Sequence, residues 1–469
     1  MAGEIKDECG VFGIYLPGGE VAQITYYGLY ALQHRGQESA GIAVADGKEI
    51  RLHKGMGLVP AVFQDKDLQS LKGYIACGHV RYSTTGASSP INAQPLVFRY
   101  AKGMLAVAHN GNLVNAYELR KNLTARGSLF QSTIDTEVII NLLARHSQGG
   151  IEDAVHKTMI DLKGSYSLVI MTQDKLLGVR DPHGIRPLCL GRLGDGYVIA
   201  SESCALDTVG AAFLRDVEPG EVVVIDENGL HSRQALPPQK QTCIFEYIYF
   251  ARPDSSIDGF GVNWCRRQMG RQLAREAPRD VDVVISVPDS GTAAARGYAE
   301  ELGLPFEEGL MKNRYIGRTF IQPSQALREL AVRLKLNPII SVVKDKRLVL
   351  VDDSIVRGTT SRRIVKMLRE AGAKEIHLLI SSPPILHPCY YGIDTSERSE
   401  LIAAQKSVEE IAQYIGVDSL HYLSLEGLLA VFQADVNQGF CTACFNGQYP
   451  VPIPPEAGKH ILEKGGSCC

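Results

Sequence analysis

The sequence predicts an α/β protein built from two unlike halves that meet near residue 240. First, residues 235–241 break the composition, because Pro237 and Pro238 interrupt helix and strand alike after the apolar run 221–225. Second, short β-branched runs mix with helical segments before this break. Third, strands and helices alternate after it, which is typical of a mostly parallel sheet. A chain of 469 residues is long enough for about two or three domains of roughly 150 residues each.

The first half combines the signals of strands and helices. Residues 10–15 and 166–171 are apolar, β-branched runs of strand length. Residues 134–146 place apolar side chains, among them Val138 and Leu142, at helical spacing. The mixture predicts stacked sheets with helices outside them.

The second half has a regular alternation of strands and helices. Buried strands are expected at 281–287, 347–351 and 376–381, and helices at 292–302 and 361–371. A sheet of this kind binds ligands beyond the carboxyl ends of its strands. The chemistry of this half is therefore expected in the strand-to-helix loops.

Composition excludes several classes of function. The chain has 49 Lys+Arg against 52 Asp+Glu, and the net charge of −3 is too small for a general binder of nucleic acid or anionic membranes. No stretch approaches the ~20 apolar residues of a membrane-spanning helix, and residues 1–8 lack the apolar stretch of a secretory signal. We expect a cytoplasmic protein. Its 11 cysteines are too sparse for a disulfide scaffold, so clustered ones indicate a metal site or catalysis.

The loop after the predicted strand 347–351 has the composition of a phosphate site. Two acids after a strand, taken alone, are commonly a solvated turn or a helix cap. Here hydroxyls, a glycine and a helix start follow, so backbone N–H groups and hydroxyls can donate to a phosphate. The carboxylates can hold ribose hydroxyls and Mg²⁺. The loop consists of Asp352, Asp353, Ser354, Ile355, Val356, Arg357, Gly358, Thr359 and Thr360.

This loop resembles the phosphoribosyl pyrophosphate signature of type I phosphoribosyltransferases, in the form found in glutamine amidophosphoribosyltransferases. Residues 286–291 resemble the pyrophosphate-binding loop of that family, 312–320 its flexible closing loop, and 245–255 its domain junction. The resemblance implies that phosphoribosyl pyrophosphate also contacts Asp289, Ser290, Gly291 and Arg314. It further implies that Ser290, Asp352 and Asp353 hold Mg²⁺.

Cys9 is the candidate nucleophile of the first half. An isolated cysteine at the start of a strand is most simply a small buried residue. However, residues 33–39, 78–84 and 109–112 resemble segments of the N-terminal-nucleophile glutaminases, which use cysteine as residue one of the mature chain. The resemblance implies cleavage of a propeptide, 1–8, after Glu8. The freed α-amine, with a reference pKa of about 7.7–8.0, would act as the base for the thiol.

The same resemblance implies a role for each residue of the glutamine site. Cys9 attacks the side-chain amide carbon of glutamine and forms a thioester. Asn110, through its side chain, and Gly111, through its N–H, form the oxyanion hole. Arg81 holds the α-carboxylate and Asp135 accepts the α-ammonium.

Simpler explanations stay open for some of these residues. Asp135 precedes a predicted helix and is equally an N-cap candidate. Gly36 lets the backbone approach the ligand, although an ordinary turn explains it almost as well. His34, His79 and His109 are not expected to form a metal or catalytic set, because each lies inside a motif whose other members carry the chemistry.

Cysteines near the end of the chain predict a metal centre. Cys441 and Cys444 form a C-x-x-C motif, whose spacing suits two thiolates on one centre. Cys243 and Cys389 match the positions used by iron–sulfur members of the family. Four thiolates would hold zinc equally well by count, so the resemblance alone selects a structural four-iron, four-sulfur (4Fe-4S) cluster.

The remaining cysteines are assigned no such role. We expect Cys77, Cys189, Cys204 and Cys265 to be small buried residues. Cys468 and Cys469 lie in the segment 458–469, which is expected to be a mobile tail.

The resemblance extends from Cys9 to about residue 449, and the chain is identified as a member of the glutamine amidophosphoribosyltransferases. It implies an N-terminal-nucleophile (Ntn) hydrolase αββα sandwich at 9–240, a type I phosphoribosyltransferase domain at 241–450, and a tail at 451–469. It also implies a homotetramer inhibited by purine nucleotides. The reaction would convert glutamine, phosphoribosyl pyrophosphate and water into 5-phosphoribosylamine, glutamate and pyrophosphate, the first step of purine biosynthesis.

The sequence leaves two alternative functions. The first is a hexosamine-forming or asparagine-forming amidotransferase, which shares the N-terminal half but does not need the loop 352–360. The second is a purine-sensing regulator without catalysis, which the intact Cys9 constellation disfavours.

For the favoured function, a shielded passage would keep ammonia neutral between the two sites. Loop 310–329 is expected to order over phosphoribosyl pyrophosphate and activate the glutaminase.

Overall fold

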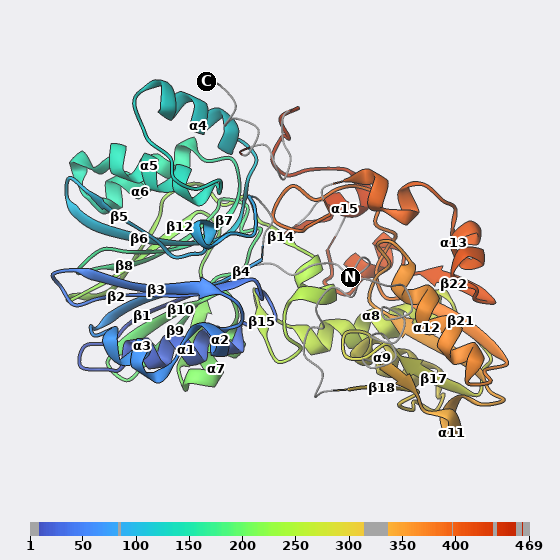
Figure 1. The fold of residues 1–469 in the computed structure, drawn as a ribbon. Coiled ribbons are helices and arrows are strands. Elements are labelled where there is room, and N and C mark those ends of the chain that lie inside the picture. Colours follow the sequence, from blue (N-terminus) through green and yellow to red (C-terminus); the bar gives the residue numbers. More distant parts are fainter. Residues whose placement is uncertain are drawn as a thin grey trace.

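Two antiparallel sheets stack face to face in the first half of the molecule, and a parallel sheet forms the second half (Figure 1). The computed structural model describes residues 9–82, 86–313, 336–395, 397–434, 439–455 and 462. The predicted propeptide and Arg314 lie outside these residues, as do most of the predicted closing loop and of the C-terminal tail.

The first half has four layers, two of helices and two of sheet (Figure 1). One sheet has the strand order β11 (Ala212–Asp216), β9 (Cys189–Leu193), β10 (Gly196–Ala200), β1 (Gly10–Tyr15), β4 (Ile75–Arg81), β2 (Ser39–Ala45) and β3 (Ile50–Met56). The other has the order β13 (Gly229–Gln234), β12 (Glu221–Asp226), β8 (Leu176–Arg180), β7 (Gly164–Met171), β6 (Gly103–Leu113) and β5 (Leu96–Tyr100). The paired strands are antiparallel throughout both sheets.

Alternating side chains explain how these layers pack. In β1, Val11 faces the second sheet while Phe12 and Ile14 face the helices on the outside. Helices α1 (Val21–Ala31), α2 (Val59–Val62), α3 (Asp65–Ser70) and α7 (Ser203–Val209) cover the first sheet. Helices α4 (Ala116–Ala125), α5 (Thr136–Arg145) and α6 (Ile151–Asp161) cover the second. This layering is the αββα sandwich that the family resemblance implies.

The second half is built on four parallel strands in the order β17 (Val283–Ser286), β20 (Arg347–Asp352), β21 (Glu375–Ile380) and β22 (Ser419–Tyr422). Helices α8 (Val262–Glu276), α9 (Thr292–Leu302) and α14 (Leu425–Ala430) pack on one face. Helices α12 (Thr359–Glu370) and α13 (Val408–Ile415) pack on the other. Short elements complete this half: β15 (Ser256–Ile257), β16 (Phe260–Gly261), β18 (Leu310–Lys312), β19 (Leu336–Pro338) and α11 (Ile340–Val343).

Most predicted elements are present, with shifted ends. The predicted strand 10–15 and helix 292–302 have the observed bounds of β1 and α9. The predicted helix 134–146 starts later, at Thr136, because Asp135 occupies the N-cap position. The predicted helix 361–371 starts earlier, at Thr359, directly after Gly358 with its φ of +70°. Helical periodicity marks the buried face of a helix, whereas its first turn depends on backbone geometry.

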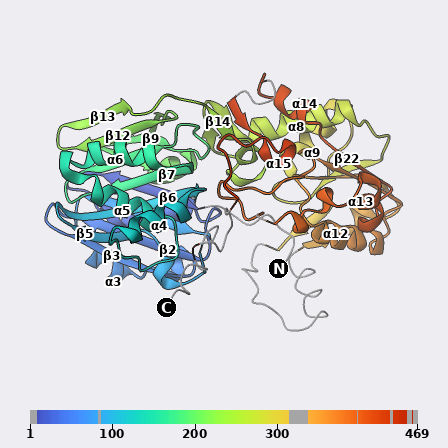
Figure 2. The same ribbon diagram turned by 90° about the horizontal axis from the view of Figure 1, so that it is seen from above.

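A short parallel strand pair lies where the two halves meet (Figures 1 and 2). β14 (Gln241–Cys243) pairs with β23 (Gly439–Cys441), so Cys243 lies opposite Cys441. β14 also follows the first half, because Gln241 N donates to His183 O at 2.7 Å and Cys243 N to Ile185 O at 3.0 Å. The pair therefore fastens the end of the second half beside the first.

None of the helices in the described residues is long and apolar enough to cross a membrane.

Leu462, within the predicted tail 458–469, is buried among core residues of the first half, including Val222 and Val224. This residue is therefore packed, contrary to the expectation of a mobile tail at that position.

Candidate functional site

Cys9 is buried directly before β1, at the edge where β4 ends. Its Sγ donates to the Tyr82 carbonyl at 3.4 Å. Burial raises the pKa of the Cys9 thiol to about 11, against the opposing effects of the Tyr82 hydrogen bond and the Arg81 charge. Asp135 and Glu38 also act electrostatically on this thiol. The structure therefore brings Arg81 and Asp135, both predicted to bind glutamine, to the predicted nucleophile, whose thiol needs a base to react at neutral pH.

Asn110 and Gly111 lie in the long central strand β6. Asn110 is buried, and its Nδ2 has no hydrogen-bond partner among the described residues. A buried unpaired donor is costly, and an anion that accepts from it would remove the cost. Gly111 has a φ of +142°, and a Cβ there would lie 2.1 Å from the Ser165 carbonyl oxygen on β7. Only glycine fits this position, which brings its backbone against β7.

Arg81 is the last residue of β4 and is almost entirely buried. Its guanidinium donates to the carbonyls of Ala87 and Gly86 at 3.3 and 3.4 Å and lies 4.0 Å from Glu38. Gly36 packs against the same end of β4, where a Cβ on residue 36 would lie 2.6 Å from the backbone nitrogen of Arg81. The need for glycine at residue 36 is therefore explained by close approach to β4.

Asp135 stands at the N-cap position of α5, but its side chain makes no capping hydrogen bond. It accepts instead from Leu113 N at 3.0 Å and lies 3.5 Å from His109 Nδ1. Burial alone would raise the pKa of Asp135, yet the His109 interactions and backbone N–H groups outweigh burial and hold the pKa below its usual value. A carboxylate that stays ionised in this position can receive a cationic amine.

The loops after β17 and β20 meet at the carboxyl edge of the parallel sheet, as expected. Val287 N donates to the Val351 carbonyl at 2.9 Å, and a Cβ on Gly291 would lie 2.5 Å from the same oxygen. Ser290 hydrogen-bonds to the Asp353 carboxylate. The structure thus brings residues from both predicted phosphoribosyl loops into contact.

Asp352 and Asp353 are buried side by side at the end of β20. Asp353 N donates to Asp352 Oδ1 at 2.9 Å, and the Ser354 hydroxyl bonds to Asp353. Burial raises the pKa of Asp353, opposed by the hydroxyls of Ser290 and Ser354 and by the charge of Arg266. A cation bound between these oxygen ligands would offset the desolvation of the carboxylates.

The remainder of this loop leads into α12. Gly358 has a left-handed backbone and precedes Thr359 and Thr360, which form the first turn of the helix. Arg357 forms an ion pair with Glu400. In the other loop, Asp289 is exposed and pairs with Lys312 Nζ at 2.6 Å. The backbone donors of a helix start and the basic side chains nearby suit a phosphorylated ligand.

The four predicted cluster cysteines come together at the junction. Cys243 and Cys441 are paired across β14 and β23, and Cys444 lies on α15 (Ala443–Asn446). The charges of Cys243, Cys389 and Cys441 all act on Cys444, whose pKa burial raises strongly. Burial likewise raises the pKa of Cys441 to about 12. Among the described residues, however, no group of three or more His, Cys, Asp or Glu side chains is placed to hold a metal ion.

The other cysteines behave as expected where the structure describes them. Cys77, Cys189, Cys204 and Cys265 are all buried, with exposed fractions of 2% or less. Cys468 and Cys469 lie outside the described residues.

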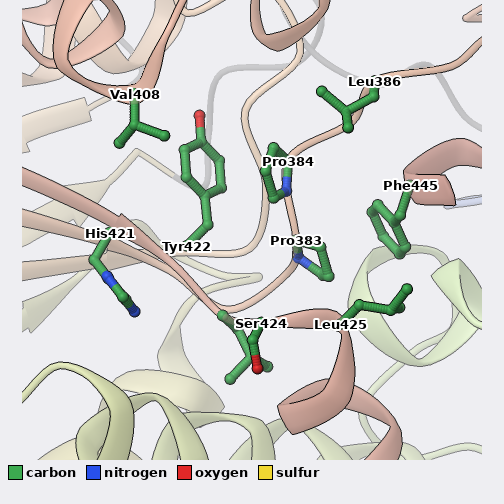
Figure 3. A pocket seen from close by; sticks show the side chains of 10 residues that line it. Pro383, Pro384, Leu386, Val408, His421, Tyr422, Ser424, Leu425 and Phe445 are labelled. Atoms are coloured by element: carbon green, nitrogen blue, oxygen red, sulfur yellow. The ribbon is translucent and has the colours of Figure 1, made fainter. Parts of the chain in front are cut away.

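A pocket of about 380 Å³ lies beyond the carboxyl end of β22 (Figure 3). No Lys, Arg, Asp or Glu lines it, and none of the predicted site residues does. The buried Tyr422 hydroxyl in its wall has no hydrogen-bond partner among the described residues. The pocket adjoins the cysteine group, because Leu386 N in its wall donates to the Cys444 carbonyl at 2.9 Å. The lining residues are Pro383, Pro384, Leu386, Val408, His421, Tyr422, Leu423, Ser424, Leu425 and Phe445.

Three charged residues near these sites received no individual role from the sequence. Glu202, Glu246 and Arg266 are all buried. Glu246 binds Arg35, 211 positions away in the sequence, and Arg266 donates to the Tyr247 carbonyl. Glu246 lies in the segment 245–255, which resembles the domain junction of the family. The role of its carboxylate becomes visible only from the residues that contact it in the folded structure.

Comparisons with known proteins agree with both halves of the structure. Residues 79–208 match the family model of the glutamine amidotransferase domain, and residues 267–384 match that of the phosphoribosyl transferase domain. The amidophosphoribosyltransferase of Bacillus subtilis is 55% identical over 462 residues, covering 97% of each chain. That of Archaeoglobus fulgidus is 55% identical over 453 residues, covering 96% of this chain and 99% of the relative.

Solved structures agree with the sequence comparisons. The glutamine phosphoribosylpyrophosphate amidotransferase of B. subtilis, complexed with ADP and GMP, superposes with a TM-score of 0.92 at 53% identity. The superposition covers 97% of this chain and 100% of that one. A second structure, described as the allosteric regulatory enzyme of purine biosynthesis, gives a TM-score of 0.93 at 53% identity, over 97% and 99% of the two chains. The chain therefore belongs to the amidophosphoribosyltransferase family, the glutamine-dependent pentosyltransferases that catalyse the first step of purine biosynthesis.

Proposed function

We propose that this chain couples a glutaminase centred on Cys9 to amination of phosphoribosyl pyrophosphate at the loops after β17 and β20. The observation that carries the proposal is the convergence of the Arg81 and Asp135 charges on the buried Cys9 thiol. A cationic and an anionic group beside one nucleophile match the α-carboxylate and α-ammonium of an amino acid. Glutamine bound between them would present its side chain to the thiol.

The chemistry at Cys9 begins with cleavage after Glu8. The α-amine of Cys9 takes the thiol proton, and Sγ attacks the amide carbon of glutamine. The tetrahedral oxyanion accepts from Asn110 Nδ2 and from the Gly111 N–H. The C–N bond then breaks, ammonia leaves with the proton, and water hydrolyses the thioester to glutamate.

Ammonia is then used at the parallel sheet. It attacks the anomeric carbon of phosphoribosyl pyrophosphate as the C–O bond to pyrophosphate breaks. Asp352 and Asp353 hold the ribose hydroxyls, the start of α12 with Thr359 and Thr360 donates to the 5′-phosphate, and Ser290 and Gly291 contact the pyrophosphate. Ser290, Asp352 and Asp353 would hold Mg²⁺, whose positive charge would offset that of the leaving pyrophosphate when the ion is bound. Arg314, on the closing loop, would add a positive charge there.

We propose that Cys243, Cys389, Cys441 and Cys444 hold a structural 4Fe-4S cluster. Burial raises the pKa of the Cys441 and Cys444 thiols, which become stable thiolates only beside a cation, and Cys243 and Cys389 neighbour them. A cube of four irons and four sulfides separates its ligands more widely than one zinc ion does. The family resemblance, rather than the number of thiols, favours this cluster over a single zinc ion.

The remaining proposals concern assembly and regulation. The B. subtilis relative was solved with ADP and GMP, which supports inhibition of this chain by purine nucleotides. We further propose a homotetramer, as the family resemblance implies, located in the cytoplasm.

The coupled reaction is tested by counting glutamate and pyrophosphate in one tube with Mg²⁺, with and without phosphoribosyl pyrophosphate. Equal release of both products is expected only when both substrates are present. Cys9→Ala is expected to abolish glutamate release while leaving pyrophosphate release driven by added ammonia. Glutamate release by Cys9→Ala, or release without pyrophosphate, would contradict the proposal.

The cluster is tested by iron and sulfide analysis of anaerobically purified protein. About four irons and four sulfides per chain are expected, and Cys389→Ser is expected to lower both. Cys265→Ser is the control, because Cys265 also lies in the core of the second half but is not part of the group. Stoichiometric zinc without sulfide would contradict the cluster.

A further inference from the structure

A buried asparagine, Asn92, joins two segments of the chain on which the proposed glutamine site depends. It ends the short 3₁₀ turn Pro90–Asn92, between β4 and β5, and is 1% exposed. The sequence motifs assigned it no role. A buried amide is stable only when its polar atoms are paired, so the partners of Asn92 show what its side chain holds in place.

Asn92 holds the segment that supports Arg81. Its Nδ2 donates to the Ala87 carbonyl at 2.9 Å. The carbonyls of Ala87 and Gly86 in turn accept from the two terminal nitrogens of the Arg81 guanidinium, at 3.3 and 3.4 Å. A guanidinium is planar, so two acceptors on consecutive residues set both its position and the direction of its plane. The direction of the Arg81 side chain therefore depends on where Asn92 holds residue 87.

The same side chain holds the segment that leads to Asp135. Asn92 Nδ2 also donates to Thr133 Oγ1 at 2.8 Å, and Asn92 Oδ1 accepts from Thr133 N at 3.1 Å. Thr133 precedes Asp135 by two residues. Gly86 packs against Thr133 as well, because a Cβ on residue 86 would lie 2.7 Å from the Thr133 carbonyl oxygen. One amide therefore sets the spacing of the two segments.

Segment 131–135 is anchored independently of Asn92. The buried Glu137 carboxylate accepts from Gln131 N at 2.8 Å, from Ser132 N at 2.7 Å and from Ser132 Oγ at 2.6 Å. A buried carboxylate with three hydrogen bonds is costly to displace. Loss of Asn92 would therefore shift the other segment, together with the guanidinium that it supports.

We propose that Asn92 is a positioning residue that sets the distance between Arg81 and Asp135 and so makes the Cys9 site selective for the amino-acid end of glutamine. The α-carboxylate and α-ammonium are attached to one carbon, so both bind at full strength only when their two partners have one definite separation. The inference rests on the proposed function, because it takes Arg81 and Asp135 as the groups that bind glutamine.

The test is Asn92→Ala in the full chain. We expect the KM for glutamine in glutamate release to rise about tenfold or more while kcat stays within about threefold, because ground state and transition state lose the same binding. Pyrophosphate release driven by added ammonia is expected to stay within about twofold, since it does not use the glutamine site. An unchanged KM would overturn the proposal.

Alkylation of Cys9 separates a positioning role from a merely structural one. The first reagent is 6-diazo-5-oxo-L-norleucine, which has the α-amine and α-carboxylate of glutamine and a diazoketone in place of the side-chain amide. The second is iodoacetamide, which has neither α group. We expect Asn92→Ala to slow the first reagent about tenfold or more and the second by less than about twofold. Equal slowing with both reagents would show a damaged site and would overturn the positioning role.

Asn115→Ala is the matched control. Asn115 is buried in the same half, and its side chain also bridges backbone groups that are distant in sequence. It donates to the Asp161 carbonyl at 2.9 Å and accepts from Lys163 N at 3.0 Å. Neither partner lies in the segments that Asn92 joins, so we expect this variant to keep the KM for glutamine and both alkylation rates. A rise in KM equal to that of Asn92→Ala would overturn the proposal.

A second variant covers the case in which Asn92→Ala does not fold. Thr133→Val keeps the shape of the side chain but removes the hydroxyl that accepts from Asn92. We expect the KM for glutamine to rise about threefold or more, and an unchanged KM would overturn the proposal. An unmodified protein that releases no glutamate and is not alkylated by the norleucine reagent would instead contradict the proposed function. The two failures are therefore distinguishable.

Discussion

Asn110 keeps a buried amide nitrogen without a hydrogen-bond partner among the described residues. Leaving such a donor unpaired costs about 1–3 kcal/mol in a folded protein. In the proposed oxyanion hole, the same donor would stabilise an oxyanion without any rearrangement, because the fold has already oriented it. The unpaired donor therefore lowers stability slightly and can donate to the oxyanion of the proposed reaction.

Asn110→Ala tests this residue directly. We expect kcat for glutamate release to fall by about 10²–10³, as after removal of one oxyanion donor, with little change in KM. The ammonia-dependent reaction is expected to persist, since it does not use Cys9. Asn141→Ala is the control, because Asn141 donates to the Glu137 carbonyl within its own helix, α5. A similar loss in both variants would contradict the assignment.

His79 predicts a dependence of stability on pH. Burial lowers the pKa of His79 to about 3, and its Nε2 donates to the His109 carbonyl at 2.9 Å. Below pH 6.5 the unfolded chain binds a proton here that the folded chain does not, so stability is complete above pH 6.5 and falls as the pH is lowered toward 3. One such group contributes about 1.4 kcal/mol per pH unit in this range.

The measurement is the urea midpoint at pH 7 and pH 5 for the unmodified protein and for His79→Gln. Glutamine keeps a donor for the His109 carbonyl but does not titrate. We expect the loss of stability between the two pH values to be smaller in the variant. Equal losses would show that other groups determine the acid sensitivity.

At the scale of elements, β6 depends on Gly111 for its contact with β7. Gly111→Ala would force a side chain to a φ of +142° and place Cβ 2.1 Å from the Ser165 backbone oxygen. Gly57→Ala is matched in backbone, with a φ of +124°, but its Cβ would meet nothing closer than 3.6 Å. We expect Gly57→Ala to cost about 1–3 kcal/mol and Gly111→Ala clearly more, by urea unfolding. Equal costs would show that the close approach to β7 is not important.

Elements with strong local periodicity could be predicted from the sequence, and their ends less well. The bounds of α9 agree with the prediction because Gly291 and Gly303 frame a continuous helical pattern. The predicted strand 281–287 is longer than β17 (Val283–Ser286), because the apolar residues Val281 and Val287 lie beyond the residues that pair with β20. Apolar residues in the sequence indicate burial, not strand pairing. Burial continues into the loops that support a site, so a strand predicted from apolar residues is too long.

Partners across the two halves could not be predicted in the same way. The Arg35–Glu246 pair joins residues 211 positions apart, and nothing in the local pattern around either residue specifies the other. The candidate site could be predicted from the sequence because its residues lie in contiguous motifs, such as 352–360. The pairing of these buried charges could not be predicted, because it depends on how the two halves pack together.

At the scale of the whole molecule, the shared buried charges predict that the halves unfold together. Arg35, Arg186 and Glu202 in the first half all have partners in the second. Unfolding either half alone would leave these charges buried and unpaired or would expose the surface around them. Calorimetry is expected to show one transition, and Asp258→Asn, which breaks the buried pair of Asp258 with Arg180 of the first half, is expected to broaden or split it. Two well-separated transitions in the unmodified protein would contradict this expectation.

The parallel pairing of β14 with β23 also sets an order for biosynthesis. Cys243 leaves the ribosome long before its partner Cys441, and 441 − 243 = 198 residues separate them. At about 5–20 residues per second, β14 waits roughly 10–40 seconds for its partner strand. The first half can fold in that interval, whereas the proposed cluster has its full set of ligands only after Cys444 is made. Insertion of iron and sulfide is therefore expected to be a late step, performed on a chain that is nearly complete.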